Sequence, residues 1–393
     1  MNILIVHNYY QVPGGEDTVV NNEKHLLEAN GHNVVLYTRN NSEIKNISKL
    51  KKILLPFSAF FSMRTYFDVR QIIKENNIDV VHVHNTLTLV SPSVYYSALS
   101  CKVPVVQTIH NFRLMCPGAT LYRNGHICED CVKKNIFCSI QHRCYRNSRA
   151  QTLFCAVNTI VHRMTRIYGK LNYICLTEFN KNKLLEINQI KPEKVFVKPN
   201  FVLNLDVLLC NRKRENQIVF VGRLDKLKGI DFLMEAWLEF ERRYGDSTPE
   251  LHIYGSGPMQ EWCSKFIAEH DCTKIVMKGF VANTEVRKII AKSKALVLPT
   301  QWYEGFPMTI VEAYSVGTPV VGTAIGNVGS LIENGVTGYT FILNNVESLI
   351  KSILKIDSID NLEVKNMFER MYSQNINYQR LIEIYSKVVG RNI

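Results

Sequence analysis

Short runs of consecutive apolar residues recur along the chain, and longer stretches with a helical spacing of apolar residues separate them. The runs cover residues 3–6, 34–37, 80–83, 103–108, 218–221, 251–254, 275–278, 295–299 and 319–322. Polar residues do not alternate with apolar ones inside these runs, which is typical of parallel strands covered by helices on both faces. The pattern therefore predicts βα units in each half of the chain and two doubly wound α/β domains.

The length of the chain agrees with this division. One hydrophobic core rarely serves 393 residues, so two domains of roughly 150 to 200 residues each are expected. A polar, basic segment at 211–217 separates the two patterns, and we place a hinge at 200–215. Ligands of parallel sheets bind beyond the carboxyl ends of the strands, so two such domains predict a cleft between them.

The composition is that of a folded protein with affinity for anions. The net charge of +12 is compatible with phosphorylated substrates, an anionic membrane surface or nucleic acid. An apolar run at 53–61 has basic neighbours and predicts either a segment at a membrane interface or a buried helix with a basic edge. Those neighbours are Lys45, Lys49, Lys51, Lys52 and Arg64. No stretch reaches the ~18 to 20 apolar residues of a membrane span, and no signal peptide is recognisable, so we expect a cytoplasmic protein, peripheral on the inner face of the membrane.

The most informative stretch is 298–313, where a strand ends, a turn with Gly305, Phe306 and Pro307 follows, and a helix begins. A helix start offers unpaired N–H groups and a partial positive charge to a diphosphate. Glu304, at the strand end, would face a sugar, and Glu312, inside the helix, would accept hydrogen bonds from two ribose hydroxyls. The alternative is that Glu304 caps the helix and Glu312 is a surface charge.

Three further groups follow predicted strands. Arg223 and Lys228 lie where a pyrophosphate needs neutralising, unless they are ordinary solvated cations of a loop. Gly14 and Gly15 would let the backbone approach a phosphate, although paired glycines are often only a turn. His110 would hydrogen-bond the transferred sugar, because its strand end should face the same cleft.

These residues resemble the motifs of a known family. The two glutamates resemble its E-x7-E pair, the two cations its phosphate-binding pair, and the two glycines its first glycine loop. Segments 255–258 and 279–281 also resemble its markers. The chain thus resembles the GT-B glycosyltransferases and, within them, the retaining glycosyltransferase family 4 (glycosyl transferases group 1).

The resemblance implies a domain plan and an activity. An acceptor-binding Rossmann-like domain would occupy 1–205 and a donor-binding one 206–374, with a final helix within 375–393 crossing back onto the first domain. The enzyme would move a hexosyl unit from a nucleotide diphosphate sugar, a UDP-sugar in preference to a GDP-sugar, to a glycan or lipid-linked acceptor in surface polysaccharide biosynthesis. Alternatives are a GT-B nucleotide-sugar hydrolase or epimerase, and a non-catalytic nucleic-acid binder. Because aromatic and basic residues do not interleave, specific binding of nucleic acid is not expected.

The resemblance also implies the catalytic roles. No metal would be required, because Arg223 and Lys228 take the place of a divalent cation. The leaving phosphate would help deprotonate the acceptor hydroxyl while these cations stabilise its charge. Glu304 would orient the donor sugar instead of attacking it, and His110 completes the predicted catalytic set.

The sequence contains eleven cysteines, and five of them fall in an insertion at about 116–144: Cys116, Cys128, Cys131, Cys138 and Cys144. Cys128 and Cys131 form a C-x2-C pair, which with Cys116 and either Cys138 or Cys144 predicts a structural zinc site. We take Cys144 as the fourth ligand, with His126 and His142 as reserves. Disulfides would not persist in a reducing compartment. The alternative is a group of unrelated thiols.

Overall fold

The computed structural model describes residues 1–11, 14–46, 48–203 and 214–390, without the side chains of 49–54. The chain divides into two compact units. Unit 1 contains residues 1–121 and 128–200 and the chain from residue 377 onward, and unit 2 contains 122–127 and 201–376. Most of the hinge expected at 200–215 falls on 204–213, outside the described residues. The basic neighbours Lys49, Lys51 and Lys52 belong to the side chains that are not described.

Unit 1 is built on a six-stranded sheet with the order β2-β1-β3-β4-β7-β8. All of its strand pairs are parallel, as the apolar runs predict. Ile3 and Ile5 of β1 face one side of the sheet and Leu4 and Val6 the other, and all four are fully buried, so both faces are covered. The strands are β1 Asn2–Tyr9, β2 Asn33–Asn40, β3 Val80–Val83, β4 Val105–Ile109, β7 Asn172–Cys175 and β8 Val195–Val197.

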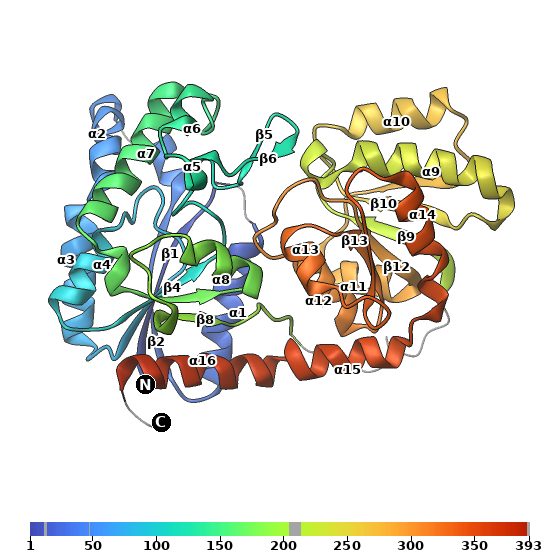
Figure 1. The fold of residues 1–393 in the computed structure, drawn as a ribbon. Coiled ribbons are helices and arrows are strands. Elements are labelled where there is room, and N and C mark those ends of the chain that lie inside the picture. The colour runs from blue at the N-terminus through green and yellow to red at the C-terminus, as the bar shows by residue number, and fades with distance from the viewer. Residues whose placement is uncertain (12–13, 47, 204–213, 391–393) are drawn as a thin grey trace. The chain divides into compact units, whose positions relative to one another are not determined.

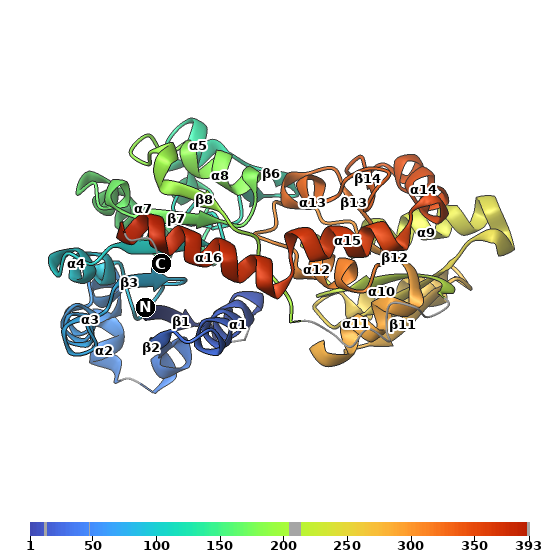
Figure 2. The ribbon, with the colours of Figure 1, turned by 90° about the horizontal axis from the view of Figure 1, so that it is seen from below.

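The helices of unit 1 pack on this sheet (Figure 1). They are α1 Gly15–Ala29, α2 Lys49–Phe60, α3 Met63–Glu75, α4 Ser93–Ser100, α5 Asp130–Lys133, α6 Cys138–Gln141, α7 Arg149–Met164, α8 Glu178–Leu185 and α16 Gln374–Val389. Leu381, Ile384 and Tyr385 of the last helix, α16, pack in one hydrophobic core with residues of α1 and of the strands. Figure 2 shows α16 running along this unit. The C-terminal end of the described chain is therefore part of the unit that contains the N-terminus.

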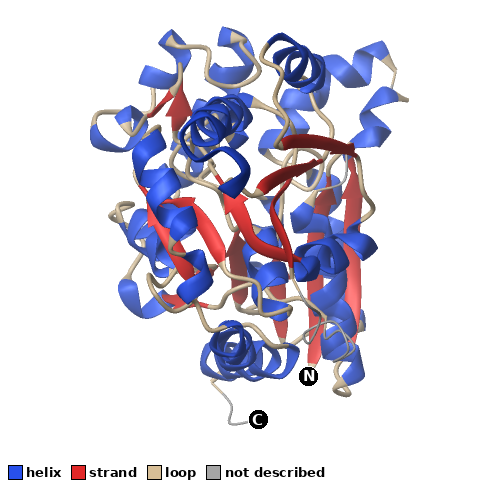
Figure 3. Ribbon diagram, turned by 90° about the vertical axis from the view of Figure 1, so that its right-hand side faces the viewer, coloured by secondary structure: helices blue, strands red, loops and turns tan. Residues whose placement is uncertain are grey.

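Unit 2 repeats the architecture, with a parallel six-stranded sheet in the order β11-β10-β9-β12-β13-β14. Its strands are β9 Glu215–Val221, β10 Glu250–Tyr254, β11 Ile275–Gly279, β12 Ser293–Leu298, β13 Val320–Thr323 and β14 Gly338–Phe341. Its helices are α9 Ile230–Tyr244, α10 Gln260–Glu269, α11 Asn283–Lys292, α12 Met308–Ser315, α13 Gly326–Leu331, α14 Val346–Leu354 and α15 Asn361–Met371. Strands lie inside and helices outside (Figure 3), around a core that includes the fully buried Trp237.

The structure adds elements that the apolar pattern did not predict. The nine runs do not cover β7, β8 and β14, which have three or four residues each. A small antiparallel hairpin, β5 Tyr122–Arg123 and β6 His126–Ile127, belongs to unit 2. Over the part of the chain that the structure describes, no helix combines the length and apolar character needed to cross a bilayer.

Candidate functional site

The loop after β9 carries the two predicted cations of unit 2, and Asp225 organises it. The Asp225 carboxylate accepts a hydrogen bond from the backbone N–H of Lys228 at 3.0 Å and lies 3.1 Å from the Nε of Arg223. Gly229 ends the turn at φ +70°, where a Cβ atom would lie 2.0 Å from the carbonyl oxygen of Pro299. The glycine therefore lets this loop pack directly on the segment that follows β12.

Lys228 and Glu304 form an ion pair with an Nζ–Oε2 distance of 2.7 Å. The Glu304 side chain is 8% exposed, and its other oxygen, Oε1, is buried without a hydrogen-bond partner among the described residues. A buried acceptor without a donor costs free energy, so an oxygen of this kind suits a hydroxyl supplied by a ligand. Glu304 lies six residues beyond the end of β12, not at the strand end itself, and Pro307 rather than Glu304 occupies the N-cap of α12.

Asn327 holds the turn that precedes α12. Its side-chain Nδ2 donates to the carbonyl oxygens of Glu304 at 2.5 Å and Gly305 at 2.6 Å. α12 begins at Met308, as predicted for a helix near Pro307, and Phe306 packs against the core of unit 2. The turn is thus held by α13, the helix that follows β13, since Asn327 is its second residue.

Glu312 lies on α12 and is not the surface charge of the alternative interpretation. Burial raises the pKa of Glu312 above its ordinary value, and the positive charge of Arg287 opposes that rise. Arg287 also donates from Nη1 to the carbonyl oxygen of Leu203 at 2.6 Å. A partly desolvated carboxylate with one nearby cation retains acceptor capacity for hydroxyl groups.

In unit 1, the predicted glycine loop begins α1. The backbone N–H of Gly14 donates to Asp17 at 2.9 Å, so this amide is already engaged, and Gly15 is the first residue of the helix. The other Asp17 oxygen lies 2.7 Å from Nε2 of the buried His7. A Cβ on Gly14 would meet no atom within 4 Å, so space is open beside the loop. Residues 12 and 13 of the motif are outside the described residues.

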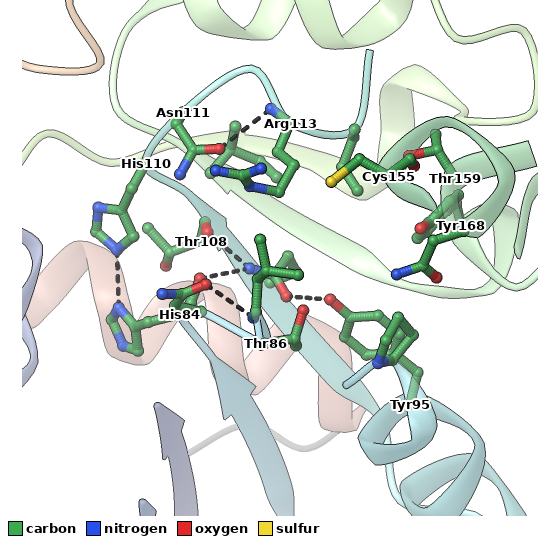
Figure 4. Close-up of a pocket in the computed structure, with 17 residues that line it drawn as sticks. His84, Thr86, Tyr95, Thr108, His110, Asn111, Arg113, Cys155, Thr159 and Tyr168 are labelled. Carbon is green, nitrogen blue, oxygen red and sulfur yellow. Dashed lines mark hydrogen bonds between the residues drawn. The ribbon is translucent and has the colours of Figure 1, made fainter. Parts of the chain in front are cut away.

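His110 ends a row of polar groups in unit 1, and Figure 4 shows its contact with His84. Its Nε2 lies 3.0 Å from Nδ1 of His84, and Nε2 of His84 lies 3.4 Å from Oε2 of Glu23. The other oxygen of Glu23 pairs with Nζ of Lys198 at 2.7 Å, and both side chains are fully buried. His82 joins the row between the hydroxyls of Thr108 at 2.7 Å and Tyr385 at 2.6 Å.

The charges in this row follow from burial and pairing. Burial opposes ionisation of Glu23, but the Lys198 ammonium and the two histidines beside it hold the pKa of Glu23 well below its ordinary value. Burial and the neighbouring His84 hold the pKa of His110 well below its ordinary value. His110 is therefore neutral at physiological pH, so its ring can take part in hydrogen bonds but not in ion pairs, and the contact to a sugar hydroxyl stays a prediction.

The row also selects a tautomer for His110. An ionised Glu23 can only accept, so a neutral His84 would carry its proton on Nε2, toward Glu23 at 3.4 Å, and would keep Nδ1 as an acceptor. Nε2 of His110 then carries its proton toward His84. The remaining nitrogen of His110, Nδ1, is left as an acceptor.

Two cavities open beside these residues at the carboxyl ends of the unit 1 strands. His84 and His110 line the first, together with Arg113 and with Tyr95, whose hydroxyl donates to Gln107 at 2.7 Å (Figure 4). The second has a volume of about 500 Å³ and shares Leu87 and Cys155 with the first. Its lining mixes apolar side chains of α2 and α7 with polar groups such as Asn41 and Arg146. A cavity of this size and composition suits a small organic ligand.

Comparisons with known proteins agree with the two-unit architecture. Residues 13–202 match the family model described as Glycosyltransferase Family 4, and 210–372 match Glycosyl transferases group 1. An uncharacterised glycosyltransferase of Methanocaldococcus jannaschii is 25% identical over 389 residues, 93% of each chain. The solved lipopolysaccharide outer core galactosyltransferase WaaB superposes with a TM-score of 0.66 at 17% identity, over 98% of this chain and 100% of that one. The chain is a glycosyltransferase of the GT-B fold. Anabaena HepE, solved with UDP, has a TM-score of 0.66 at 16% identity over 98% of this glycosyltransferase and 100% of its own chain.

Sequence reasoning missed several groups that support the glycosyltransferase site. Asp225 and Asn327 both follow strands, which was the one available signal. His82 lies within the run at 80–83 and His84 directly after it, and this two-residue spacing places both on the same side of the sheet. Glu23 and Lys198 gave no local signal, because their pairing depends on the fold alone.

Glu16, next to the glycine loop, gives the glycosyltransferase a pH-dependent stability. Burial, with the negative charge of Asp17 added to it, raises the pKa of Glu16 from 4.5 to about 8. The folded state therefore holds this proton more tightly than the unfolded chain does, and stability is lost as the pH rises from 4.5 to about 8. We expect Glu16→Gln to remove this loss, so that the variant melts above the wild type at pH 8.5 and close to it at pH 5. Melting temperatures at both pH values check this, with Glu28→Gln, exposed on the same helix, as the control. An equal drop in wild type and Glu16→Gln would contradict it.

Proposed function

We propose that this glycosyltransferase transfers a hexosyl unit from a UDP-sugar, with retention of configuration, to a glycan or lipid-linked acceptor of surface polysaccharide biosynthesis. The observation that carries the proposal is the Lys228–Glu304 pair, in which one buried carboxylate oxygen has no donor among the described residues. Arg223 is tied through Asp225 to the same loop. This combination offers cations to a diphosphate and an acceptor to a sugar hydroxyl.

The names of similar proteins support the choice of donor and pathway. HepE has been solved with UDP and with UDP-glucose. Two relatives from Klebsiella pneumoniae come from a cps region, at 21% and 24% identity over 90% and 93% of this chain. We therefore favour UDP over GDP as the nucleotide, and a cytoplasmic enzyme, peripheral on the membrane, as its setting.

In the proposed reaction, Arg223 and Lys228 stabilise the charge that develops on the leaving diphosphate. The acceptor oxygen attacks the anomeric carbon from the side on which the diphosphate leaves, and a phosphate oxygen takes the hydroxyl proton. Glu304 accepts a hydrogen bond from the donor sugar and orients it, and Glu312 binds the ribose hydroxyls. No metal ion is required in this scheme, since the two cations supply the positive charge.

The first domain takes the acceptor in this proposal. The cavities beside His110 lie at the carboxyl ends of the strands, where ligands of parallel sheets bind. The acceptor Nδ1 of His110 would receive a hydrogen bond from a hydroxyl of the transferred sugar.

Calorimetric titration of UDP and GDP into metal-free protein tests the donor site. We expect micromolar binding of UDP and a loss of affinity of about tenfold or more in Glu312→Ala, because each ribose hydrogen bond to a carboxylate contributes ~1.5 to 3 kcal/mol. Glu347→Ala, which changes an exposed glutamate on α14 of the same unit, is the matched control. Failure of both nucleotides to bind would overturn the proposal, and turnover of UDP-sugar without any acceptor would identify a hydrolase instead.

A further inference from the structure

Helix α7 of unit 1 turns large apolar side chains to solvent. Leu153, Val157 and Met164 are all exposed, Met164 by 76%, and their spacing of four and seven residues places them along one line of the helix. The opposite side is buried and mostly polar, and it includes Asn158 and His162. A helix on a protein surface in water normally has the reverse pattern. The outward side of α7 therefore has the character of a contact surface.

The buried polar groups fix this orientation of α7. Nδ2 of Asn158 donates to the carbonyl oxygen of Ala59 at 3.5 Å, and Nε2 of His162 lies 3.2 Å from the carbonyl oxygen of Phe60. The other ring nitrogen of His162 lies 2.9 Å from the hydroxyl of Tyr96 on α4. Rotation of α7 would break these hydrogen bonds and leave buried polar groups unpaired, which costs free energy. The apolar side of the helix is therefore held outward.

The helices beside α7 expose apolar side chains as well. Figures 1 and 2 show α2 and α3 along the same side of unit 1 as α7. Phe57 of α2 is 73% exposed, and Met63 and Phe67 of α3 are also exposed. Among the large apolar side chains described in unit 1, the exposed ones all belong to these three helices or to Phe137, at the start of α6, which packs on α7. Exposed apolar area is thus concentrated around α7, which is typical of an interaction site.

The surroundings of α7 are basic. Between Asp130 and Glu178 the sequence contains no acidic residue. The exposed cations around α7 in this stretch are Arg143, Arg146, Arg149, Arg166 and Lys170. None of them forms an ion pair within the part of the chain that the structure describes. Arg149 begins the helix and continues the line of Leu153, and Arg166 lies two residues beyond its end, so unpaired cations flank the apolar residues on both sides.

The residues that make up this surface, here called the α7 face, are Arg149, Leu153, Val157, Met164 and Arg166. We propose that the α7 face binds the surface of a bilayer that contains anionic lipids, with α7 parallel to that surface. The three apolar side chains enter the boundary between headgroups and acyl chains, and the two arginines contact lipid phosphates. The 16 residues of α7 extend for about 24 Å, so several lipids contact the helix at once.

Charge favours a bilayer over a second copy of the chain as the partner. In a symmetric dimer built on the α7 face, the same surface occurs on both sides, so the arginines of the two copies come together and repel each other. Anionic lipids attract all of these cations. The stretch between Glu43 and Asp68, which contains α2 and the start of α3, also has no acidic residue, and the one carboxylate that follows it, Asp68, lies 3.5 Å from Nε of Arg64.

The cysteine insertion that precedes α7 gives no comparable support for its predicted metal ion. Among the residues that the structure describes, no three sulfurs of the insertion lie within 4.8 Å of one another. The cysteines concerned are Cys116, Cys128, Cys131, Cys138 and Cys144. The zinc site expected from their spacing therefore stays a prediction.

Docking by the α7 face would place the larger cavity of unit 1 beside the lipid. α2 contributes Leu55 and Ala59 to the lining of this cavity, and α7 contributes Gln151 and Phe154. Under the proposed function, in which the cavities of unit 1 take the acceptor, this placement favours a lipid-linked acceptor over a free glycan. That consequence rests on the proposed function, whereas the docking surface itself does not.

Sedimentation of the full-length protein with lipid vesicles tests the proposal. We expect the wild type to bind vesicles of phosphatidylcholine and phosphatidylglycerol in equal amounts, and to bind phosphatidylcholine alone about tenfold or more weakly. Leu153→Ser/Met164→Ser should bind the anionic vesicles about tenfold or more weakly than the wild type, because it removes apolar area that enters the membrane. The matched control is Leu354→Ser/Leu362→Ser, which changes two exposed leucines on helices of unit 2 and should bind as the wild type does.

Arg149→Gln/Arg166→Gln tests the charges of the α7 face separately from its apolar residues. We expect about tenfold or more weaker binding to the anionic vesicles, and a smaller further loss when salt is added than the wild type shows. Lys278→Gln/Lys292→Gln, which changes two exposed cations of unit 2, is the matched control. This second variant decides the matter if thermal melting shows that the first double variant does not fold.

Absence of wild-type binding to the anionic vesicles would overturn the proposal, and so would equal binding by the wild type and both variants of the α7 face. A wild-type dimer in solution that dissociates when the apolar residues are replaced would also overturn it, because a second copy would then cover the face. Titration of UDP into the same proteins separates this result from the proposed function. We expect UDP to bind unit 2 equally well in the wild type and in all four variants, and loss of UDP binding with intact vesicle binding would contradict the proposed function alone.

Discussion

Lys228→Ala is expected to lower the turnover of the donor sugar by about two orders of magnitude or more. The change removes the cation that pairs with Glu304 at 2.7 Å and that we assign to the leaving diphosphate. It also leaves a buried carboxylate without its cation, so the orientation of Glu304 is lost together with the charge. Release of UDP during steady-state turnover, with substrate and enzyme concentrations varied, measures the effect.

Lys226→Ala is the matched control. Lys226 is exposed on the same short turn, so its substitution removes the same charge from the same loop. We expect its turnover to stay close to that of the wild type. If the two lysine variants lose activity equally, the effect comes from the overall positive electrostatic potential of the loop, and the assignment of Lys228 is wrong. A rise in KM with unchanged kcat in Lys228→Ala would indicate uniform binding in place of transition-state stabilisation.

Arg223→Ala and Glu304→Gln separate the contributions of two further residues of the same site. Arg223 is well exposed and held by Asp225, so its removal should reduce turnover without lowering stability. Glu304→Gln keeps the shape of the side chain but removes the charge that pairs with Lys228, and we expect a loss of turnover of similar size to that of Lys228→Ala. Thermal melting of both variants distinguishes lost chemistry from lost folding.

The fold could be predicted from the sequence wherever the signal was local. The run at 80–83 coincides with β3, and the other eight predicted strands are within a few residues of the observed ones, because a strand buried on both faces is mostly apolar. The helix near Pro307 was predicted correctly for the same reason, since turn residues and a helix start are read from adjacent positions. β7 (Asn-Tyr-Ile-Cys) and β14 (Gly-Tyr-Thr-Phe) begin with residues that are not apolar, so neither is recognised as an apolar run.

The site was predictable only in part, because half of it depends on residues far apart in the chain. Lys228 and Glu304 were each selected as loop residues after a strand, yet their direct ion pair joins positions 76 residues apart. His110 was selected in the same way, but its partner His84 and the Glu23 behind it were not. Glu23 reads as one more polar residue of α1, and only the three-dimensional structure shows that it is fully buried beside Lys198.

Lys198→Met is expected to destabilise unit 1 by about 3 to 5 kcal/mol, the usual cost of breaking a buried ion pair from one side. Lys198 donates to Glu23 at 2.7 Å and to the side-chain oxygen of Asn377 on α16 at 3.0 Å. Its loss therefore leaves a buried carboxylate unpaired and also weakens the attachment of the last helix. Chemical denaturation followed by circular dichroism and tryptophan fluorescence measures the change.

The pH dependence of this variant provides a test that simple loss of packing would not pass. In the wild type the pKa of Glu23 lies below its ordinary value, so the pair stabilises the fold above pH 4.5 and this stability is lost as the pH falls through the lowered pKa. Without Lys198, burial dominates and raises the pKa of Glu23, so the stability of Lys198→Met should instead fall as the pH rises from 5 to 8. The double variant Glu23→Gln/Lys198→Met should lose this slope and recover part of the stability, whereas Lys24→Met, from an exposed pair on α1, should change stability by less than about 1 kcal/mol. Equal stability of the single and double variants at pH 8 would show that Glu23 is not a buried charge. The proton positions derived for His84 and His110 would then be wrong as well, because they depend on an ionised Glu23.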